Sequence, residues 1–234
     1  MSESTNFVYT GLSELEETER NLIGYNTFIV KIFLEHSNFS KNVLDFGAGI
    51  GTLSNIWRKL NQNCLITCLE LDKKQLEILS NRKFKTLTSL NSSEKFEYIF
   101  SSNVLEHIEN DREALNQIYS SLINKGRLGI FVPANQILYS HIDKKIEHFR
   151  RYSRKELESK VKSSGFKIEK CQYVDSIGFF AWGVAKILKL DFQGENSKKL
   201  KFYDKVIWPV SKFLDNLGFK FIFGKNLLLL AVKE

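Results

Sequence analysis

Three glycines at alternate positions, Gly47, Gly49 and Gly51, stand where an apolar run gives way to a helical pattern. Residues 43–46 read as a buried parallel strand, and the apolar spacing from Thr52 onward predicts a helix. A glycine loop between a strand and a helix turns the chain tightly, exposes main-chain N–H groups and lies at the positive end of the helix. The chemistry that this pattern favours is the binding of a nucleotide-type ligand.

A carboxylate follows the loop at the spacing that such a site needs. Glu70 ends the next apolar run, residues 64–69, and stands about 20 positions after Gly51. In a strand-helix-strand unit this spacing puts the carboxylate at the tip of the neighbouring strand, where it can accept hydrogen bonds from both hydroxyls of a ribose. Such bonds contribute about 1.5–3 kcal/mol each. An ordinary tight turn is the alternative explanation of the glycines, and Asp45 together with Glu70 makes it less favoured.

The run Val-Leu-Asp-Phe-Gly-Ala-Gly-Ile-Gly, followed by Leu-Glu-Leu-Asp, resembles the class I S-adenosylmethionine (SAM) methyltransferases. In that family an acidic residue precedes GxGxG, whereas nicotinamide-binding proteins usually carry GxGxxG without this acid. The resemblance runs from about residue 20 to the C-terminus, and it implies SAM as the cofactor and S-adenosylhomocysteine as the product. By this resemblance the methionine part is held by Asp45, Phe46, Gly47, Ala48, Gly49 and Gly51, the ribose by Glu70, and the adenine lies beside Leu71.

The end of the fourth predicted strand, residues 98–101, carries the side chains expected nearest the methyl group. Ser102 and Asn103 follow this strand directly, and strand ends on the carboxyl side of an open parallel sheet face the ligand crevice. His107 would share a face with Asn103 if this turn is helical. Its unperturbed pKa near 6.5 suits a general base that takes a proton from a hydroxyl. A histidine that only shapes the pocket is the alternative, with equal weight.

Two positions depart from patterns that the family often shows. Ser89 and Leu90 end the third predicted strand, where many members hold the adenine with an acidic residue that this chain lacks. The Leu-Glu-His run at 105–107 resembles the fourth motif of quinone-type O-methyltransferases, some of which carry glutamate in place of Asn103 with a divalent metal nearby. We therefore expect no metal ion. The motif is not Asn-Pro-Pro-Tyr, so DNA adenine and glutamine substrates are less favoured.

A loop on the acceptor side is predicted at residues 140–153, which mix histidine, arginine and aromatic residues without a clear period. Its run His-Phe-Arg-Arg-Tyr-Ser resembles a branch of bacterial methyltransferases that often accompany surface-sugar and lipid biosynthesis. The resemblance places His148, Arg151 and Tyr152 around the acceptor. Tyr25 would face the site if the N-terminal segment closes over the cofactor. The alternatives are a basic surface turn for the loop and a core position for Tyr25.

The pattern and the resemblance together predict one α/β domain, a Rossmann-like, seven-stranded, mostly parallel sheet with helices on both faces. An N-terminal helical cap spans 1–40, with residues 11–36 read as helical; the cofactor-binding core spans 41–175, and the final strand spans 226–234. Between the last two strands, a helical insertion at 176–225 replaces the short hairpin usual in this fold. Its apolar segments carry lysines at intervals. They could form a lid over a greasy substrate, a dimer face, a membrane-docking patch or additional core.

Composition limits the kinds of partner and the cellular location that are expected for the chain. The 234 residues carry a net charge of +7, which suits an anionic partner such as nucleic acid, a phospholipid surface or a phosphorylated substrate, although a solvated lysine-rich surface explains it equally well. The three cysteines form no CxxC pair, which argues against a disulfide framework or a zinc site. With neither a membrane-spanning run nor a signal peptide, the chain is predicted to be cytoplasmic, and peripheral contact with a membrane stays open.

The function that the sequence favours is SAM-dependent methyl transfer to a small-molecule or lipid- or sugar-linked acceptor, preferably at oxygen because His107 is available as a base. The first alternative is an RNA or protein methyltransferase, although no RNA-binding module is recognised and nucleic acid is not the favoured partner. The second is a non-catalytic binding or scaffold subunit with the same fold. Whether the chain acts as a monomer or a homodimer is left open.

Overall fold

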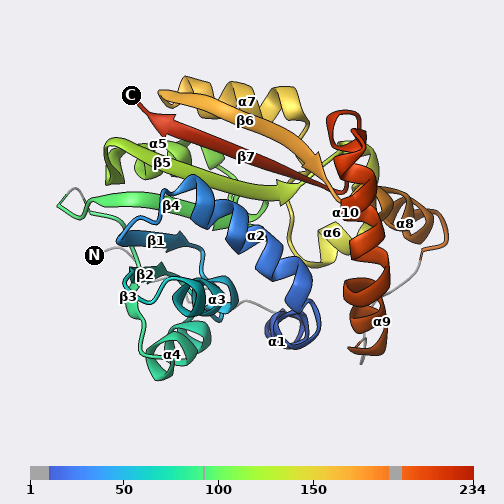
Figure 1. Cartoon of the computed structure of the whole chain (residues 1–234), viewed down its shortest axis with the longest axis horizontal. Helices are drawn as coiled ribbons and strands as arrows, with labels where there is room; N and C mark the ends of the chain where they lie inside the picture. Colours follow the sequence, from blue (N-terminus) through green and yellow to red (C-terminus); the bar gives the residue numbers. More distant parts are fainter. Residues whose placement is uncertain (1–10, 92, 190–196) are drawn as a thin grey trace.

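A seven-stranded sheet forms the centre of the computed structural model, which describes residues 11–91, 93–189 and 197–234 (Figure 1). The strand order is β3-β2-β1-β4-β5-β7-β6; β1 to β5 run parallel, and β7 runs antiparallel to both of its neighbours. This confirms the predicted fold class. The strands are β1 (Asn42–Phe46), β2 (Leu65–Leu69), β3 (Lys85–Leu87), β4 (Phe96–Ser102), β5 (Leu122–Pro133), β6 (Phe166–Val174) and β7 (Asn226–Lys233).

Helices cover both faces of the sheet because alternate residues of each strand point to opposite sides. In β1, Val43 belongs to one buried cluster together with Trp57, whereas Leu44 belongs to another together with Leu115. The first cluster lies under α2, α3 and α4, and the second under α5 and α7. These helices are α2 (Ile23–His36), α3 (Thr52–Leu60), α4 (Lys73–Asn81), α5 (Asp111–Ser121) and α7 (Arg154–Ser163).

The N-terminal cap is two helices rather than one. Helix α1 (Leu12–Asn21) ends at Leu22, whose φ of −106° and ψ of 48° are not helical, and α2 begins directly after it. The two helices therefore meet at a bend, which the apolar stripe of residues 11–36 did not predict. The first ten residues of the predicted cap lie outside the described part of the chain.

Short elements occupy the carboxyl side of the sheet. The turn after β4 is the 3-10 helix η1 (Leu105–His107), and β5 is followed by the 3-10 helix η2 (Gln136–Leu138) and the short helix α6 (His141–Lys145). The segment between α6 and α7 then returns along this edge, where Tyr152 forms an isolated bridge with Ala134. The predicted acceptor-side loop thus lies beside the end of β5.

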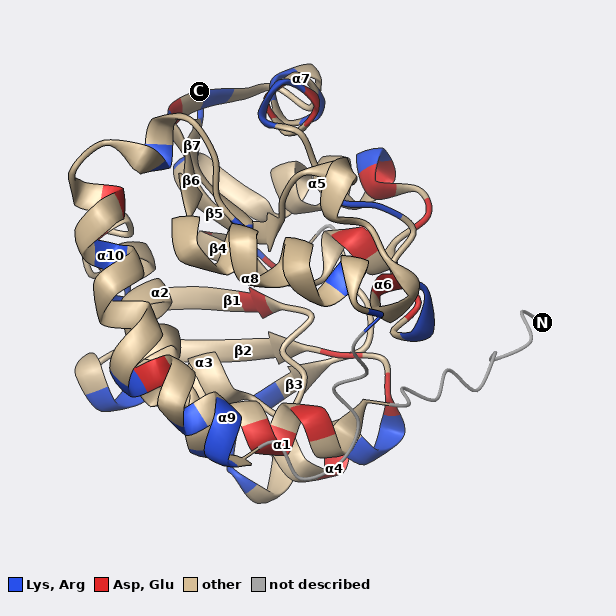
Figure 2. Ribbon diagram, turned by 90° about the vertical axis from the view of Figure 1, so that its right-hand side faces the viewer, with Lys and Arg blue, Asp and Glu red and all other residues tan. Residues whose placement is uncertain are grey.

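The predicted insertion between β6 and β7 is helical in its described residues, as Figure 2 shows from the side on which it lies. Residues 190–196 lie outside the description. Its elements are α8 (Ser176–Ile187), α9 (Ser197–Phe202), the π-helical turn η3 (Tyr203–Ile207), α10 (Trp208–Asn216) and the 3-10 turn η4 (Phe219–Phe221).

The insertion is tied to the cap by Asp204, whose carboxylate accepts hydrogen bonds from the backbone N–H groups of Gly24 and Tyr25, both at 2.8 Å. A carboxylate there accepts from N–H groups that the start of a helix leaves unpaired, and its negative charge interacts favourably with the positive end of the dipole of α2. Among the helices in the described residues, none is both long enough and apolar enough to cross a bilayer.

Candidate functional site

A cavity of about 560 Å³ opens at the carboxyl ends of the parallel strands, where β1 and β4 lie side by side and their connections leave in opposite directions. This is the place where open α/β sheets bind ligands, and the volume is typical of small-molecule sites. Most of the predicted site residues contribute to its wall. Those that do are Tyr25, Asp45, Phe46, Gly47, Ala48, Gly49, Glu70, Leu71, Ser102, Asn103, His107, His148 and Arg151.

The glycine loop forms one wall of this cavity. The N–H groups of Gly47 and Ala48 both donate to the carbonyl of Leu69, at 3.0 and 2.9 Å, which ties the loop to the end of β2. Gly47 has φ of 77°, and a Cβ there would come within 2.4 Å of Val104. The third glycine, Gly51, does not line the cavity: with φ of 80° it serves the turn into α3.

Glu70 lies at the end of β2, as predicted, and its carboxylate is bound to the loop. Oε2 accepts from the N–H of Gly49 at 2.8 Å, and Oε1 accepts from the N–H groups of Leu71 and Asp72 at 2.7 and 3.1 Å. A carboxylate has about four lone-pair sites, so these three hydrogen bonds leave roughly one. The carboxylate thus holds the loop and β2 in one arrangement. Its contact with ribose hydroxyls stays a prediction.

Asp45 is buried at the base of the loop, and its Oδ2 accepts a hydrogen bond of 2.7 Å from the hydroxyl of Ser54 at the start of α3. The pKa of Asp45 is raised to about 7, chiefly by burial; the hydrogen bond from Ser54 lowers it in part, and the negative charge of Glu70 adds to the rise. A cation bound nearby would stabilise the ionised form of this carboxylate. The position therefore suits a ligand that brings positive charge into the cavity.

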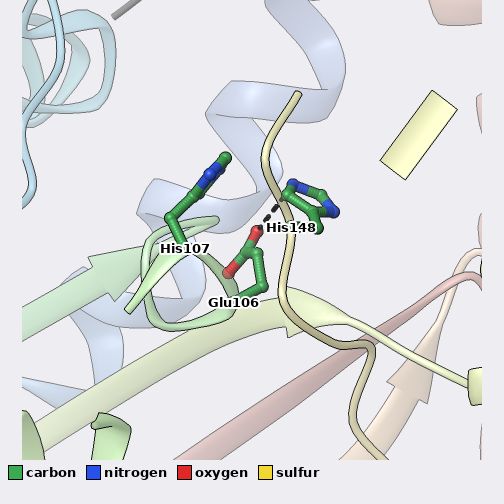
Figure 3. A group of neighbouring side chains, drawn as sticks. All are labelled: Glu106, His107 and His148. Carbon is green, nitrogen blue, oxygen red and sulfur yellow. Dashed lines mark ion pairs between the residues drawn. The ribbon is translucent and has the colours of Figure 1, made fainter. Parts of the chain in front are cut away.

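Two histidines meet at the other end of the cavity (Figure 3). The rings of His107 and His148 lie edge to face with their centroids 4.5 Å apart. Burial, and then the neighbouring His148, lower the pKa of His107 to about 4. His107 is therefore neutral at physiological pH.

Glu106 lies beside the histidine pair and is completely buried. Its Oε1 is 3.7 Å from Nε2 of His148, and neither of its carboxyl oxygens has a hydrogen-bond partner among the described residues. Burial raises the pKa of Glu106 to about 8, so the carboxyl is mainly protonated at neutral pH. Glu106 is part of the Leu-Glu-His run, in which nothing indicated that its side chain is buried.

A second carboxylate holds His148 in place. Oδ1 of Asp143 lies 3.0 Å from Nδ1 of His148 and 2.7 Å from Nε of Arg151, and Asp143 is fully buried. If Nδ1 carries the proton, Nε2 is left as a hydrogen-bond acceptor. Sequence reasoning did not select Asp143; the only signal for it was its capping-box spacing from Ser140, which the structure shows at the start of α6.

The three side chains of Figure 3 could also hold a metal ion. One ligand atom from each of Glu106, His107 and His148 lies within 4.8 Å of the others. A carboxylate and two imidazoles are ligands that zinc and other transition metals accept. The absence of a metal from this site therefore stays a prediction, and a chelation test is given below.

Three predicted site residues lie away from the cavity wall in addition to Gly51. Tyr152 is fully buried, and its hydroxyl is 2.7 Å from Oδ2 of Asp111 and 3.1 Å from the carbonyl of Leu105, so it belongs to the core behind the acceptor-side loop. Ser89 is exposed and Leu90 packs against the core. Both follow β3, an edge strand separated from β1 by β2, and neither lines the cavity; their contact with adenine stays a prediction.

Tyr25 both faces the cavity and belongs to the core, the two positions that were predicted as alternatives. It lines the cavity, and it is also buried: its hydroxyl accepts a hydrogen bond of 2.6 Å from Asn226, and its ring meets Trp208 edge to face at 4.7 Å. The insertion also reaches the cavity through Trp182 of α8, over whose ring the guanidinium of Arg151 lies at 4.9 Å. Sequence patterns did not indicate this contact because the two residues come from separate segments.

Comparisons with known proteins give one family and one fold. A family model described as a methyltransferase domain matches residues 20–170, and none of the curated proteins matches the chain significantly. Among solved structures, a SAM-dependent methyltransferase from Archaeoglobus fulgidus is 18% identical with a TM-score of 0.62, over 94% of this chain and 99% of that one.

Two further structures are similar at comparable identity. Phosphoethanolamine N-methyltransferase 2 of Haemonchus contortus, in complex with SAM, is 17% identical with a TM-score of 0.63, over 98% of this chain and 58% of that one. The 1,6-didemethyltoxoflavin-N1-methyltransferase of Burkholderia thailandensis, with its substrate and S-adenosylhomocysteine bound, is 15% identical with a TM-score of 0.59, over 96% and 84%. At these identities the similarity shows the fold alone.

Proposed function

This chain belongs to the methyltransferase-domain family and is a SAM-dependent methyltransferase, and we propose that it methylates an oxygen atom of a small-molecule or lipid- or sugar-linked acceptor. The observation that carries this proposal is the single cavity that joins the glycine loop and Glu70 to the half-buried histidine pair. Both ends of the cavity fall within the matched residues 20–170. The nitrogen acceptors named for the two similar structures are properties of those proteins.

The residues on the β1 and β2 side fit SAM. Asp45 would face the positively charged methionine part of SAM, and Glu70 has a remaining lone pair that could accept from a ribose hydroxyl. A Cβ built at Gly49 would meet only Gln75 and Leu15, each at 3.5 Å, so the loop leaves space for a ligand beside Gly49. When bound, SAM supplies a methyl group on a sulfonium, which is already a good leaving group. The protein therefore has to orient the acceptor and exclude water, and orientation alone can lower a barrier by about 7–11 kcal/mol.

We assign the base to His148 rather than to His107. A histidine whose pKa is about 4 is a weak proton acceptor, which makes His107 the poorer base although it lines the cavity. His148 has the arrangement that an imidazole base needs, with Asp143 holding Nδ1 and Nε2 left to accept. His148 would accept the hydroxyl proton at Nε2 while the acceptor oxygen gains the methyl group, the carbon–sulfur bond breaks and the sulfur leaves as the neutral thioether of S-adenosylhomocysteine. His107 then acts as a positioning residue against the ring of His148.

Turnover with SAM labelled in its methyl group tests the function. After incubation with an extract that is separated into lipid, small-molecule, RNA and protein fractions, we expect label in the lipid or small-molecule fraction. Label found only in RNA or protein would overturn the acceptor class. Absence of transfer to any fraction, with SAM binding intact, would favour a non-catalytic subunit.

Alanine variants of the two histidines test the base. We expect His148→Ala to lower kcat by about 10²–10⁴-fold with an unchanged Kd for SAM, because general base catalysis contributes about that factor. His107→Ala should lower kcat less and leave the pH dependence of kcat/KM in place. If His107→Ala lowers kcat more than His148→Ala does, His107 is the base.

A further inference from the structure

An unbroken apolar stripe lies on the outer side of α8. Phe180, Val184, Ile187 and Leu188 are all exposed, and their spacing of four, three and one residues puts them on one side of the helix. Ile187 has 79% of its surface exposed. The opposite side of α8 is buried through Ala185. This helix is therefore fixed to the protein on one side and apolar toward solvent on the other.

A second stripe follows the helical run from α9 through η3 to α10. Its exposed members recur every three or four residues, with Phe213 exposed to 62%. The inner side of the run is anchored by Trp208, which packs edge to face on Tyr25 and Phe28. The exposed members are Phe202, Val206, Val210, Phe213 and Leu217.

Turn η4 adds Phe221 and Ile222, also exposed, and its Phe219 is linked through Phe223 to Phe180 of α8 by ring contacts of 5.7 and 5.1 Å. Helices α8 and α10 pack against each other. We call the exposed side chains of α8, of the α9 to α10 run and of η4 the outer apolar face. In the described residues, the insertion holds twelve of the twenty large apolar side chains that are exposed. Scattered single side chains are ordinary, but such a concentration marks an interaction surface.

The charges around this face are positive. In residues 176–189 and 197–225 there are nine lysines and only two acidic residues; two of these lysines are engaged elsewhere, since Lys225 lines the cavity and Lys186 donates to the carbonyl of Ile137. Both carboxylates accept hydrogen bonds from backbone N–H groups elsewhere: Asp204 caps α2, and Asp215 receives the N–H groups of Asp175 and Ser176. The lysines of α9 and α10 are visible in blue in Figure 2. A partner for this face must therefore be apolar at its centre and anionic at its edge.

We propose that the outer apolar face docks on the surface of a bilayer that contains anionic phospholipids. Apolar side chains would enter the boundary between headgroups and acyl chains, and the long lysine stems would extend to the phosphates. A protein partner with an acidic rim is not favoured because lysine is depleted from protein interfaces. Binding is peripheral, since none of the described helices could span a bilayer.

The position of the face relates it to the proposed function. In Figure 1, α8, α9 and α10 lie at the end of the molecule toward which β1 points, which is also the end where the cavity opens. Helix α8 contributes Trp182 to the cavity wall and Val184 to the outer apolar face. Docking would hold the cavity near the bilayer, where a lipid-linked acceptor lies. This last step rests on the proposed function, whereas docking itself does not.

Cosedimentation with vesicles tests the docking. Wild-type protein is mixed with vesicles of phosphatidylcholine, with or without phosphatidylglycerol. We expect binding to the anionic vesicles, and weaker binding at high salt because the lysine contribution is screened. Phe213→Ser and Ile187→Ser should each weaken binding about tenfold or more, because each removes the transfer energy of a large side chain. Leu65→Ser, at an apolar position on β2 whose exposed fraction is close to that of Phe213, is the matched control and should bind as wild type does.

Two results would overturn the proposal. The first is that the wild type, Phe213→Ser and Ile187→Ser sediment with anionic vesicles to the same extent. The second is that light scattering without lipid detects a concentration-dependent dimer of the wild type that both variants abolish. SAM affinity is measured for every variant, so loss of the fold is distinguished from loss of the face. Vesicle binding without methyl transfer would contradict the proposed function and support the docking. Methyl transfer without vesicle binding would support the proposed function and contradict the docking.

Discussion

The affinity for SAM should depend on pH through Asp45. Burial holds the pKa of this carboxyl at about 7 in the free protein, and only the ionised form can pair with the positively charged ligand. Because the pKa is raised, ionisation, and with it affinity, is gained as the pH rises toward 7 and lost as the pH falls. The α-amino group of SAM titrates near 7.7–8.0, above this window.

The size of the effect follows from the ionised fraction. With a pKa of about 7, roughly 3% of Asp45 is ionised at about pH 5.5 and half at pH 7. When only one form binds, the apparent Kd is the intrinsic Kd divided by the fraction of that form. The apparent Kd should therefore fall about 15-fold between these two pH values.

Equilibrium dialysis against labelled SAM across this range measures the effect. Asp45→Asn should bind more weakly and show an almost flat curve. Ser54→Ala should shift the curve to higher pH, since it removes the hydrogen bond that lowers the pKa of Asp45. Glu35→Gln, on the exposed side of α2, is the control for a lost carboxylate. If the wild-type curve is flat, or if Asp45→Asn shows the same slope as the wild type, ionisation of Asp45 does not control the affinity for SAM.

Three further predictions concern other parts of the site. Gly49→Val should abolish SAM binding without unfolding the protein, because φ of 58° disfavours a β-branched residue and the side chain would enter the cavity; retained binding in calorimetry would contradict the loop assignment. Tyr152→Phe should lower the free energy of unfolding in urea by about 1–2 kcal/mol, since a buried Asp111 oxygen loses a donor, and leave SAM affinity unchanged; a changed affinity would place Tyr152 in the site. Dialysis against a chelator should leave turnover unchanged, and loss that a divalent metal restores would show that the side chains of Figure 3 are ligands.

The end of the cavity that the glycine loop and Glu70 line was predictable because its residues are close in sequence. The spacing from Asp45 through the glycines to Glu70 spans one strand-helix-strand unit, whose geometry is nearly fixed. In the structure this unit brings the glycine loop and Glu70 into contact, because the N–H of Gly49 donates a hydrogen bond to the Glu70 carboxylate. The two apolar clusters follow in the same way from the alternation of residues along buried strands.

The end of the cavity with the histidine pair was predictable only in part, because it is assembled from segments that are distant in sequence. Nothing in the run at 105–107 shows that Glu106 points into the core or that His107 meets His148 across the cavity. The choice of His107 as the base came from its residue type, whereas the orienting carboxylate of Asp143 is visible only in the fold. The sequence motif with Tyr152 was informative about packing rather than about contact with a substrate.

Calorimetric titration of the wild type and of Glu70→Ala with SAM shows whether the carboxylate at the end of β2 binds the cofactor. We expect one-site binding by the wild type and an affinity about ten- to hundredfold lower in the variant, since a charged hydrogen-bond acceptor for the ribose is lost. No heat of binding with the wild type, or equal affinity in the variant, would contradict this expectation.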